Sequence, residues 1–533
     1  QSLQIVRELD NRAGTAATLN NIASIYDDQE QFEQAIDTYE QALSLVRSGD
    51  RSGEATTLSN IGASLISLQR YAEDERTLRA AIDLLDAMRP GLSDTEKVNI
   101  FETQAATYRL LQFALAEQNK VELALEIAER SRARAFVDLL TTRLAADTTT
   151  PIEAAAPDIA TIQQTAIDRN ATLVEYTLIC NDRLYILVVQ PTGEVTLRKV
   201  DLQGLAAPID QVAERTRVAA AIGRGSSLES LVSETRSNLR ASESPETRPA
   251  NRQLQQLHQI LIAPIADLLP TDPNASVVFV PQDALFLVPF AALQDANGQY
   301  LIQQHTIAIA PAIQALSLTA ERSNSSGIDL IVGNPTMPSL SIAPNEPPQP
   351  LPGLPGAEQE AKAVGEVLRS PVLIGSQATE TAVVAEMPEA RIIHLATHGL
   401  LDGFEAEATP GAIALAPSEN SDGFLNASEI LNLNLKADLV VLSACDTGRG
   451  RITGDGVIGL SRSLLLAGAS SVVVSLWAVP DDATAALMVE FYRQREQQPN
   501  KAQALRQAML TLIDQPQFAN PRDWSAFFLI GST

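Results

Sequence analysis

The feature that most constrains the fold is a short, uninterrupted hydrophobic run, Leu439–Ser443. A strand with apolar residues on both faces is typical of a parallel sheet that is covered by helices on both sides. Cys445 follows two residues after the end of this run. Because chemistry in open α/β sheets gathers at the carboxyl ends of the strands, this thiol is a candidate nucleophile.

A second run of the same kind, within residues 391–399, has His398 at its carboxyl end and Gly399 immediately after it. If the two strands are parallel neighbours, His398 and Cys445 emerge at the same edge of the sheet, and 46 residues between them leave room for a crossover. Imidazole would then raise the thiolate fraction and later protonate the leaving amine. The N–H groups of Gly399 and Cys445 could bind a developing oxyanion.

Six short motifs, in this order and spacing, carry a family resemblance. They are His-Leu-Ala-Thr-His-Gly (394–399), Leu-Ser-Ala-Cys-Asp-Thr-Gly (442–448), Gly-Asp-Gly (454–456), Leu-Ser-Arg (460–462), Ala-Gly-Ala (467–469) and Ser-Leu-Trp-Ala-Val-Pro-Asp (475–481). The sequence resembles the CHAT family, a caspase-like domain found attached to tetratricopeptide (TPR) repeats. It is more distantly similar to caspases, separases and gingipains.

The resemblance implies a cysteine endopeptidase with a Cys445–His398 dyad, acting on a protein substrate without a metal or an organic cofactor. It also implies a multidomain chain, in which an all-α TPR solenoid precedes an α/β caspase-like domain. Strands that alternate with helices in the last third of the chain predict a mostly parallel sheet with helices on both faces.

The first 140 residues repeat with a period of 39: residues 18–23 resemble residues 57–62, and Phe32 and Tyr71 keep the same offset. Small and aromatic residues at fixed positions are typical of helix pairs that pack closely, so residues 1–140 are predicted to form TPR-like repeats. Such an array presents a surface that we expect to bind a regulatory protein, although a purely structural spacer is the alternative. Residues 1–9 resemble the second helix of a repeat, so we expect the protein to begin before Gln1.

Two further regions are expected after the repeats. Residues 141–320 should form a linker and a first, non-catalytic lobe that contains a sheet, and residues 321–533 should form the catalytic lobe. Residues 219–251 are rich in Ser, Arg and Glu, which predicts a mobile loop or a partly disordered insertion. Residues 338–355 hold seven prolines and are predicted to form a loop that borders the site.

Cys445 and its neighbours also allow other interpretations. A buried, inert thiol is the commoner fate of cysteine, but the turn residues Asp446–Gly448 and the His-Gly pair favour catalysis. A zinc site built from His394, His398 and Cys445 is disfavoured because the sequence offers no further ligand nearby, and His394 is expected to be a satisfied core residue.

Acidic residues near the predicted edge are candidates for binding the substrate. Residues 477–481 resemble the Trp-x-Val-x-Asp segment of separase-like enzymes, in which an acid reads a basic residue before the cut, so Asp481 or Asp482 would select Arg or Lys. The alternative is that one of the pair caps the helix that follows. Asp446, beside the thiol, is a further candidate for substrate contact.

The net charge of −26 argues against nucleic acid or an anionic membrane as the main partner, and it suits a basic protein. Only two cysteines occur, Cys180 and Cys445, so a reducing, cytoplasmic location is expected. The rival interpretation is a catalytically silent or latent TPR scaffold that binds partner proteins. The sequence gives neither the substrate nor the oligomeric state.

Overall fold

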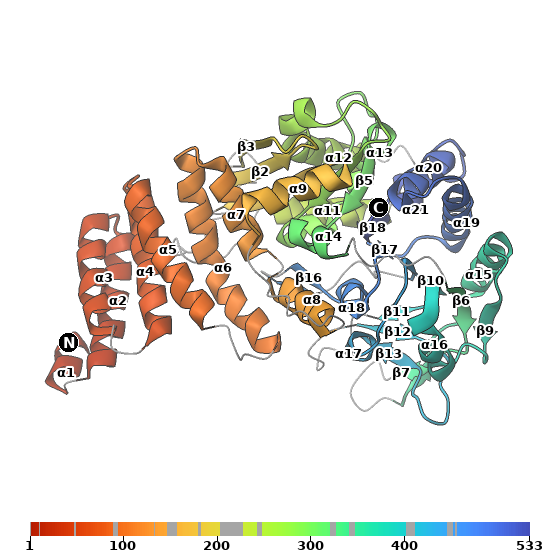
Figure 1. Ribbon diagram of the computed structural model, residues 1–533, viewed down its shortest axis with the longest axis horizontal. Helices are drawn as coiled ribbons and strands as arrows, with labels where there is room; N and C mark the ends of the chain where they lie inside the picture. The colour runs from red at the N-terminus through yellow and green to blue at the C-terminus, as the bar shows by residue number, and fades with distance from the viewer. Residues whose placement is uncertain are drawn as a thin grey trace.

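The computed structural model describes residues 2–9, 11–46, 50–88, 94–132, 134–146, 157–179, 183–202, 227–241, 248–319, 327–340, 347–400, 411–444, 451–453 and 456–533. Figure 1 shows helices stacked side by side at one end of an elongated molecule, and strands with their covering helices at the other end. The predicted fold class, helical repeats followed by an α/β domain with a mostly parallel sheet, is confirmed.

The N-terminal array is built from helices that repeat the sequence period. Asn11 and Asp50, 39 residues apart, each cap the following helix by accepting a hydrogen bond from the backbone N–H of a glycine three residues later. The array comprises α1 (Ser2–Glu8), α2 (Arg12–Asp28), α3 (Phe32–Val46), α4 (Arg51–Ser67), α5 (Tyr71–Ala87), α6 (Asp94–Glu117) and α7 (Val121–Ser131).

Close packing between α4 and α5 depends on a glycine. A Cβ atom added to Gly62 would clash with the side chain of Leu78 and would lie 2.8 Å from Oδ1 of Asp74. Ala23, Ala42 and Ala81 are fully buried at other helix contacts of the array. Each of these small residues lets two helix backbones approach closely, so small residues recur with the 39-residue period of the sequence.

Eleven strands form one sheet, in the order β3-β2-β1-β4-β5-β18-β17-β14-β10-β6-β9. Neighbours are parallel except for β1–β2, β2–β3 and β17–β18. The strands are β1 (Ala171–Ile179), β2 (Arg183–Val189), β3 (Val195–Asp201), β4 (Ser276–Val280), β5 (Thr306–Ile309), β6 (Ile328–Pro335), β9 (Val372–Gly375), β10 (Ala390–Ala396), β14 (Leu439–Ser443), β17 (Ser471–Ser475) and β18 (Phe527–Gly531).

Smaller ladders lie beyond this sheet: β7 (Ser339–Leu340) with β8 (Gln349–Pro350), β11 (Gly399–Leu400) with β12 (Ala412–Ala414) and β13 (Phe424–Asn426), and β15 (Arg451–Thr453) with β16 (Gly456–Ile458). Every residue of β4, β14 and β17 is buried, which indicates that both faces of the central sheet are covered.

The helices outside the array are α8 (Arg134–Ala146), α9 (Ile159–Arg169), α11 (Ser227–Arg240), α12 (Arg248–Leu261), α13 (Leu301–Gln304), α14 (Ile313–Thr319), α15 (Pro355–Leu368), α16 (Glu380–Glu386), α17 (Ala427–Leu431), α18 (Leu460–Ala467), α19 (Asp481–Gln497), α20 (Lys501–Ile513) and α21 (Pro521–Trp524). Short 3₁₀ turns are η2 (Ala263–Leu268), η3 (Asp283–Leu287), η4 (Phe290–Ala292) and η6 (Met387–Glu389).

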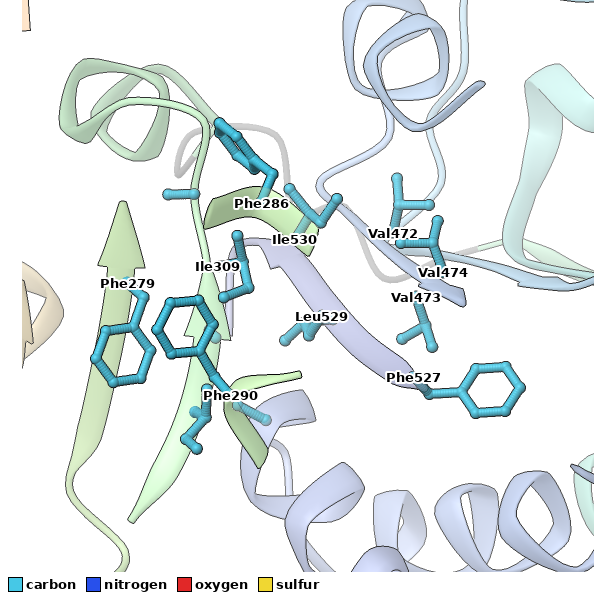
Figure 2. Close-up of a cluster of buried hydrophobic side chains, with 14 of the residues drawn as sticks. Phe279, Phe286, Phe290, Ile309, Val472, Val473, Val474, Phe527, Leu529 and Ile530 are labelled. Atoms are coloured by element: carbon cyan, nitrogen blue, oxygen red, sulfur yellow. The ribbon is translucent and has the colours of Figure 1, made fainter. Parts of the chain in front are cut away.

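The strands of both expected lobes belong to this one sheet, and β18 joins them. It runs antiparallel to β17 on one side and pairs with β5 through Ile530 and Ile309 on the other. Figure 2 shows the hydrophobic cluster at this junction, where Phe290 lies beside Phe279 and Leu529 lies between β5 and β17. The rings of Phe279 and Phe290 are stacked with their centroids 4.4 Å apart. The sheet therefore has a continuous core across the boundary expected near residue 320.

The expectation of a loop or a disordered insertion over residues 219–251 is wrong for its described part. Residues 227–240 form α11, and Leu228, Leu231, Val232 and Leu239 on it are buried. These four residues recur at helical spacing, so a narrow apolar stripe was hidden among Ser, Arg and Glu residues. Residues 219–226 and 242–247 lie outside the described part of the chain.

Ion pairs connect the helical array to the sheet. Arg132, just after α7, donates from Nε to Oε1 of Glu175 on β1 at 3.0 Å, and it also donates to the carbonyl oxygens of Pro281 and Tyr176. Glu129 on α7 accepts hydrogen bonds from the backbone N–H groups at the start of α14. Burial raises the pKa of Glu175, even though the charge of Arg132 acts in the opposite direction. The array and the sheet thus share a buried polar contact.

Candidate active site at the carboxyl edge of the sheet

The strands that carry the predicted histidine and thiol are parallel neighbours. β10 pairs with β14 in a register that sets Ala396 opposite Ser443. His398 follows Ala396 by two residues, and Cys445 follows Ser443 by two residues in the sequence. Both strands therefore end at the same edge. Cys445 and Asp446 themselves lie outside the residues that the structure describes, so their predicted roles remain predictions.

The end of β14 is anchored from the next strand. The hydroxyl of Ser475, at the end of β17, donates to the carbonyl oxygen of Ala444 at 2.6 Å. This contact fixes the direction in which the chain leaves β14 immediately before position 445.

The imidazole of His398 is half-buried, and its Nε2 atom lies 2.8 Å from the carbonyl oxygen of Pro352. A carbonyl oxygen can only accept a hydrogen bond, so Nε2 must carry the proton in the neutral ring. Nδ1 is then the unprotonated nitrogen, which leaves it as the proton acceptor. An imidazole held in this tautomer by a backbone group is able to accept a proton at Nδ1.

Pro352 belongs to the proline-rich stretch that is expected to border the site, and its carbonyl oxygen contacts His398. The signal in the sequence was the density of prolines, which predicted a loop but not which carbonyl oxygen would meet the histidine. Every residue has a backbone carbonyl oxygen, so the type of residue does not indicate which of them accepts from His398. The sequence therefore does not predict this partner.

Gly399 follows the histidine on β11. The backbone carbonyl oxygen of His398 accepts a hydrogen bond from the backbone N–H of Ala414 at 3.0 Å, and Gly399 faces Ile413 at the next position of the ladder. Hydrogen-bonded and non-hydrogen-bonded pairs alternate in an antiparallel ladder, so the N–H of Gly399 points away from β12. This direction is compatible with a role as an oxyanion donor.

Asp481 and Asp482 are exposed and occupy the first turn of α19. The N-cap position of α19 is occupied by Pro480, and no side chain there accepts a capping hydrogen bond. The alternative interpretation, that Asp481 or Asp482 caps the helix, is therefore wrong. Both carboxylates are favourably placed at the positive end of the helix dipole.

Asp481 also lies against the segment that contacts the histidine. A Cβ atom added to Gly356, at the start of α15, would clash with the carboxylate of Asp481. Four residues earlier, Pro352 accepts the hydrogen bond from His398. Residues 352–356 therefore border both the imidazole and this carboxylate. Nearby Asp523 has a raised pKa because it is partly buried and faces the charge of Asp482.

His394 is buried beneath this edge, as expected, but it is not fully satisfied, because its Nε2 atom has no hydrogen-bond partner among the described residues. Its Nδ1 lies 3.2 Å from the hydroxyl of Tyr492 on α19, and its Nε2 lies 3.1 Å from Oε1 of Glu360 on α15, off the line of a hydrogen bond. The disfavoured zinc site needs Cys445 and stays untested. Within the described ranges, no group of three or more His, Cys, Asp and Glu side chains could hold a metal ion.

Comparison with known proteins agrees with the motifs. The sequence model of the CHAT domain matches residues 251–532, which is more than half of the chain, and that of a tetratricopeptide repeat matches residues 1–48. The chain belongs to the CHAT domain family. The predicted resemblance, a CHAT domain preceded by TPR repeats, is thereby confirmed.

Two curated relatives of this CHAT protein are the tetratricopeptide repeat protein 28 of Homo sapiens and that of Mus musculus. Each is 26% identical over 91% of this chain. The chain spans about a quarter of their length, 24% and 25% respectively.

Two solved structures show a distant similarity to the chain. One is the separase–securin complex of Saccharomyces cerevisiae, at 11% identity and a TM-score of 0.47, with 99% of this chain and 47% of the other covered. Another is the complex of the pro- and mature domains of RgpB from Porphyromonas gingivalis, at 13% identity and a TM-score of 0.34, with 57% and 75% covered. Among the described helices of the CHAT protein, none is long and apolar enough to cross a membrane.

Proposed function

We propose that this CHAT protein is a cysteine endopeptidase that cleaves a partner protein. In this proposal Sγ of Cys445 attacks the scissile carbonyl carbon while Nδ1 of His398 takes the thiol proton. The N–H groups of Gly399 and Cys445 bind the oxyanion. The carbon–nitrogen bond breaks as His398 protonates the leaving amine, and water then hydrolyses the thioester with His398 again acting as base.

The observation that carries the proposal is the common register of β10 and β14, together with the hydrogen bond that assigns the proton of His398 to Nε2. A base that is already in the correct tautomer needs no reorganisation before it takes the thiol proton. Membership of the CHAT family, with its His-Gly and Ala-Cys motifs at the two strand ends, supports the same assignment.

The substrate side of the proposal rests on charge. Asp481 is exposed beside residues 352–356, Asp482 is next to it, and Asp446 follows the thiol in the sequence. Carboxylates beside the scissile bond would favour Arg or Lys, because a guanidinium or ammonium group would pair with them. The net charge of −26 suits a basic partner protein, and the presence of only two cysteines suits a reducing, cytoplasmic setting.

We also propose that the helical array regulates cleavage. Nη2 of Arg109 on α6 lies 2.8 Å from Oδ2 of Asp283, the first residue of η3. η3 in turn lies against the hairpin β15–β16, which follows Cys445 in the chain. A partner that moves α6 would act on this hairpin through one ion pair and one packed turn.

The test is hydrolysis of fluorogenic peptides that end in Arg, Lys or Ala, by the wild-type protein and by Cys445→Ala. We expect Arg and Lys peptides to be cleaved, and the variant to lose at least about 10³-fold in rate while keeping its fold. Cys180→Ser is the matched control and should keep full activity. Equal hydrolysis by Cys445→Ala would refute the nucleophile, and a preference for the Ala peptide would refute the acidic pocket.

The second candidate function is a silent or latent scaffold, and the names of the curated relatives, which refer to the repeats, are the observation that favours it. Iodoacetamide separates the two, because a thiol activated by His398 reacts much faster near neutral pH than an ordinary one. Rates are measured on Cys180→Ser, with and without His398→Ala. A slow rate that the histidine does not change would favour the scaffold.

A further inference from the structure

Asn334 stands at the carboxyl end of β6, next to the strand of His398. β6 and β10 are parallel, with Gly333 opposite Ala396. The pairing of β6 with β9 shifts between Gly333 and Pro335, and Asn334 has a left-handed backbone with φ of +44°. Asparagine tolerates this conformation better than most residues, so the bulge turns its side chain away from the regular ladder.

Both ends of the Asn334 amide are engaged. Oδ1 accepts a hydrogen bond from the backbone N–H of Leu354 at 2.7 Å, and Nδ2 donates to Oε2 of Glu358 at 3.1 Å. Hydrogen bonds from Lys362 and then from Asn334 lower the pKa of Glu358, so its carboxylate is an acceptor near neutral pH. A backbone N–H at one end and a carboxylate at the other fix which way the amide points.

These contacts bracket the carbonyl group that holds the histidine. Pro352 accepts from Nε2 of His398, and two residues later Leu354 donates to Asn334. On the other side, the backbone N–H of Leu351 donates to the carbonyl oxygen of Pro338 at 3.0 Å. Gly353, between Pro352 and Leu354, has no side chain that could make a contact to stabilise this segment. The direction of the Pro352 carbonyl group therefore depends on Asn334 from one side.

We propose that Asn334 is a positioning residue for His398. It holds residues 352–354 so that the Pro352 carbonyl oxygen keeps the proton on Nε2, and thereby presents Nδ1 for proton transfer. This inference rests on the peptidase proposed above for its effect on rate, but its effect on the imidazole is independent of catalysis.

The variant that removes the contact with least backbone strain is Asn334→Gly, because glycine adopts positive φ freely. We expect a fall in kcat of about 10- to 100-fold with KM little changed, as for a base displaced by about 1 Å. The matched control is Lys362→Met, which removes the other hydrogen-bond partner of Glu358, at 2.6 Å, and should leave kcat unchanged.

A second pair of variants tests the direction of the amide without deleting the side chain. Asn334→Asp keeps the acceptor for Leu354 but sets a second carboxylate against Glu358, so activity should fall. In the double variant Asn334→Asp, Glu358→Gln, the glutamine amide would donate to the new carboxylate at position 334, so donor and acceptor are exchanged. This double variant should restore at least half of the lost rate. Failure of the double variant to recover more than Asn334→Asp alone would overturn the proposal.

The imidazole is read directly by NMR of protein labelled with ¹⁵N at its four histidines. In the wild type, we expect one Nε2–H signal protected from solvent exchange that disappears in His398→Ala. The same signal should be lost in Asn334→Gly and return in the double variant. A signal that persists in Asn334→Gly overturns the inference, even where activity has fallen. If no peptide is hydrolysed by the wild type, the peptidase fails while this measurement still decides the role of Asn334.

Discussion

Replacing Asp74 by Asn should stabilise the helical array, and the gain should grow as the pH rises. Asp74 is fully buried between α4 and α5, and among the residues that the structure describes neither of its carboxyl oxygens has a hydrogen-bond partner. Burial, followed by the charge of Glu75, raises its pKa from 3.8 to about 8. The folded array therefore keeps this carboxyl protonated at a pH at which the unfolded chain has already released the proton.

The sign and the size follow from proton linkage. Below pH 3.8 both states are protonated and there is no penalty. Between 3.8 and about 8 the folded state binds the extra proton, so stability falls as pH rises, by about 1.4 kcal/mol per pH unit. At pH 7 this amounts to about 4 kcal/mol. Asn cannot ionise, so Asp74→Asn should match the wild type within about 1 kcal/mol near pH 4 and exceed it by about 4 kcal/mol at pH 7.

The assay is urea unfolding followed by circular dichroism at a helical wavelength, at pH 5, 6, 7 and 8. Both tryptophans, Trp477 and Trp524, are buried in the α/β part, so their fluorescence reports that part and not the array. Asp83→Asn is the control, because it removes one exposed negative charge from the same helix. A stability difference between Asp74→Asn and wild type that stays constant from pH 5 to 8, or that narrows, would refute the reasoning.

Three further substitutions test packing and the junction, each by its free energy of unfolding in urea. Gly62→Ala should destabilise the array by about 1–3 kcal/mol, because the new methyl group meets Leu78, and a neutral or stabilising result would mean that the helices part at no cost. Arg132→Met should cost about 3 kcal/mol, because Glu175 keeps its burial and loses its cation; a cost below about 0.5 kcal/mol would show that the pair is dispensable. Gly468→Ala should cost about 3 kcal/mol, because φ is +125° and the carbonyl oxygen of Leu435 blocks the new Cβ, and normal stability there would contradict the close approach.

The sequence predicted those parts of the fold that local hydrophobicity determines. The run Leu439–Ser443 is the whole of β14, and the 39-residue period gave the helix pairs of the array. β18 was not assigned as a strand, because a five-residue apolar segment does not reveal that two separate sets of strands meet on it. α11 was missed because its buried residues are sparse along a polar segment.

The candidate site was predictable only in its side chains. His398, Gly399 and Asp481 lie at the edge where strand order predicts them, while Cys445, Asp446 and the reaction itself stay predictions. The Pro352 carbonyl oxygen and the contact of Asn334 with Leu354, 20 residues apart, depend on how a loop folds back. No spacing rule encodes such a contact, because it joins a side chain to a backbone atom of a segment that is distant in the sequence.

The position of β18 in the middle of the sheet has a consequence for synthesis. A ribosome must extend the chain through Phe527–Gly531 before β5 and β17 can acquire their common neighbour. Until then the nascent polypeptide carries two incomplete sheets, each with an open edge that invites pairing with another chain. Termination before Phe527 would therefore leave a polypeptide that contains every proposed catalytic residue and yet lacks the strand that unites its sheet. Such a product should be found with chaperones or in aggregates.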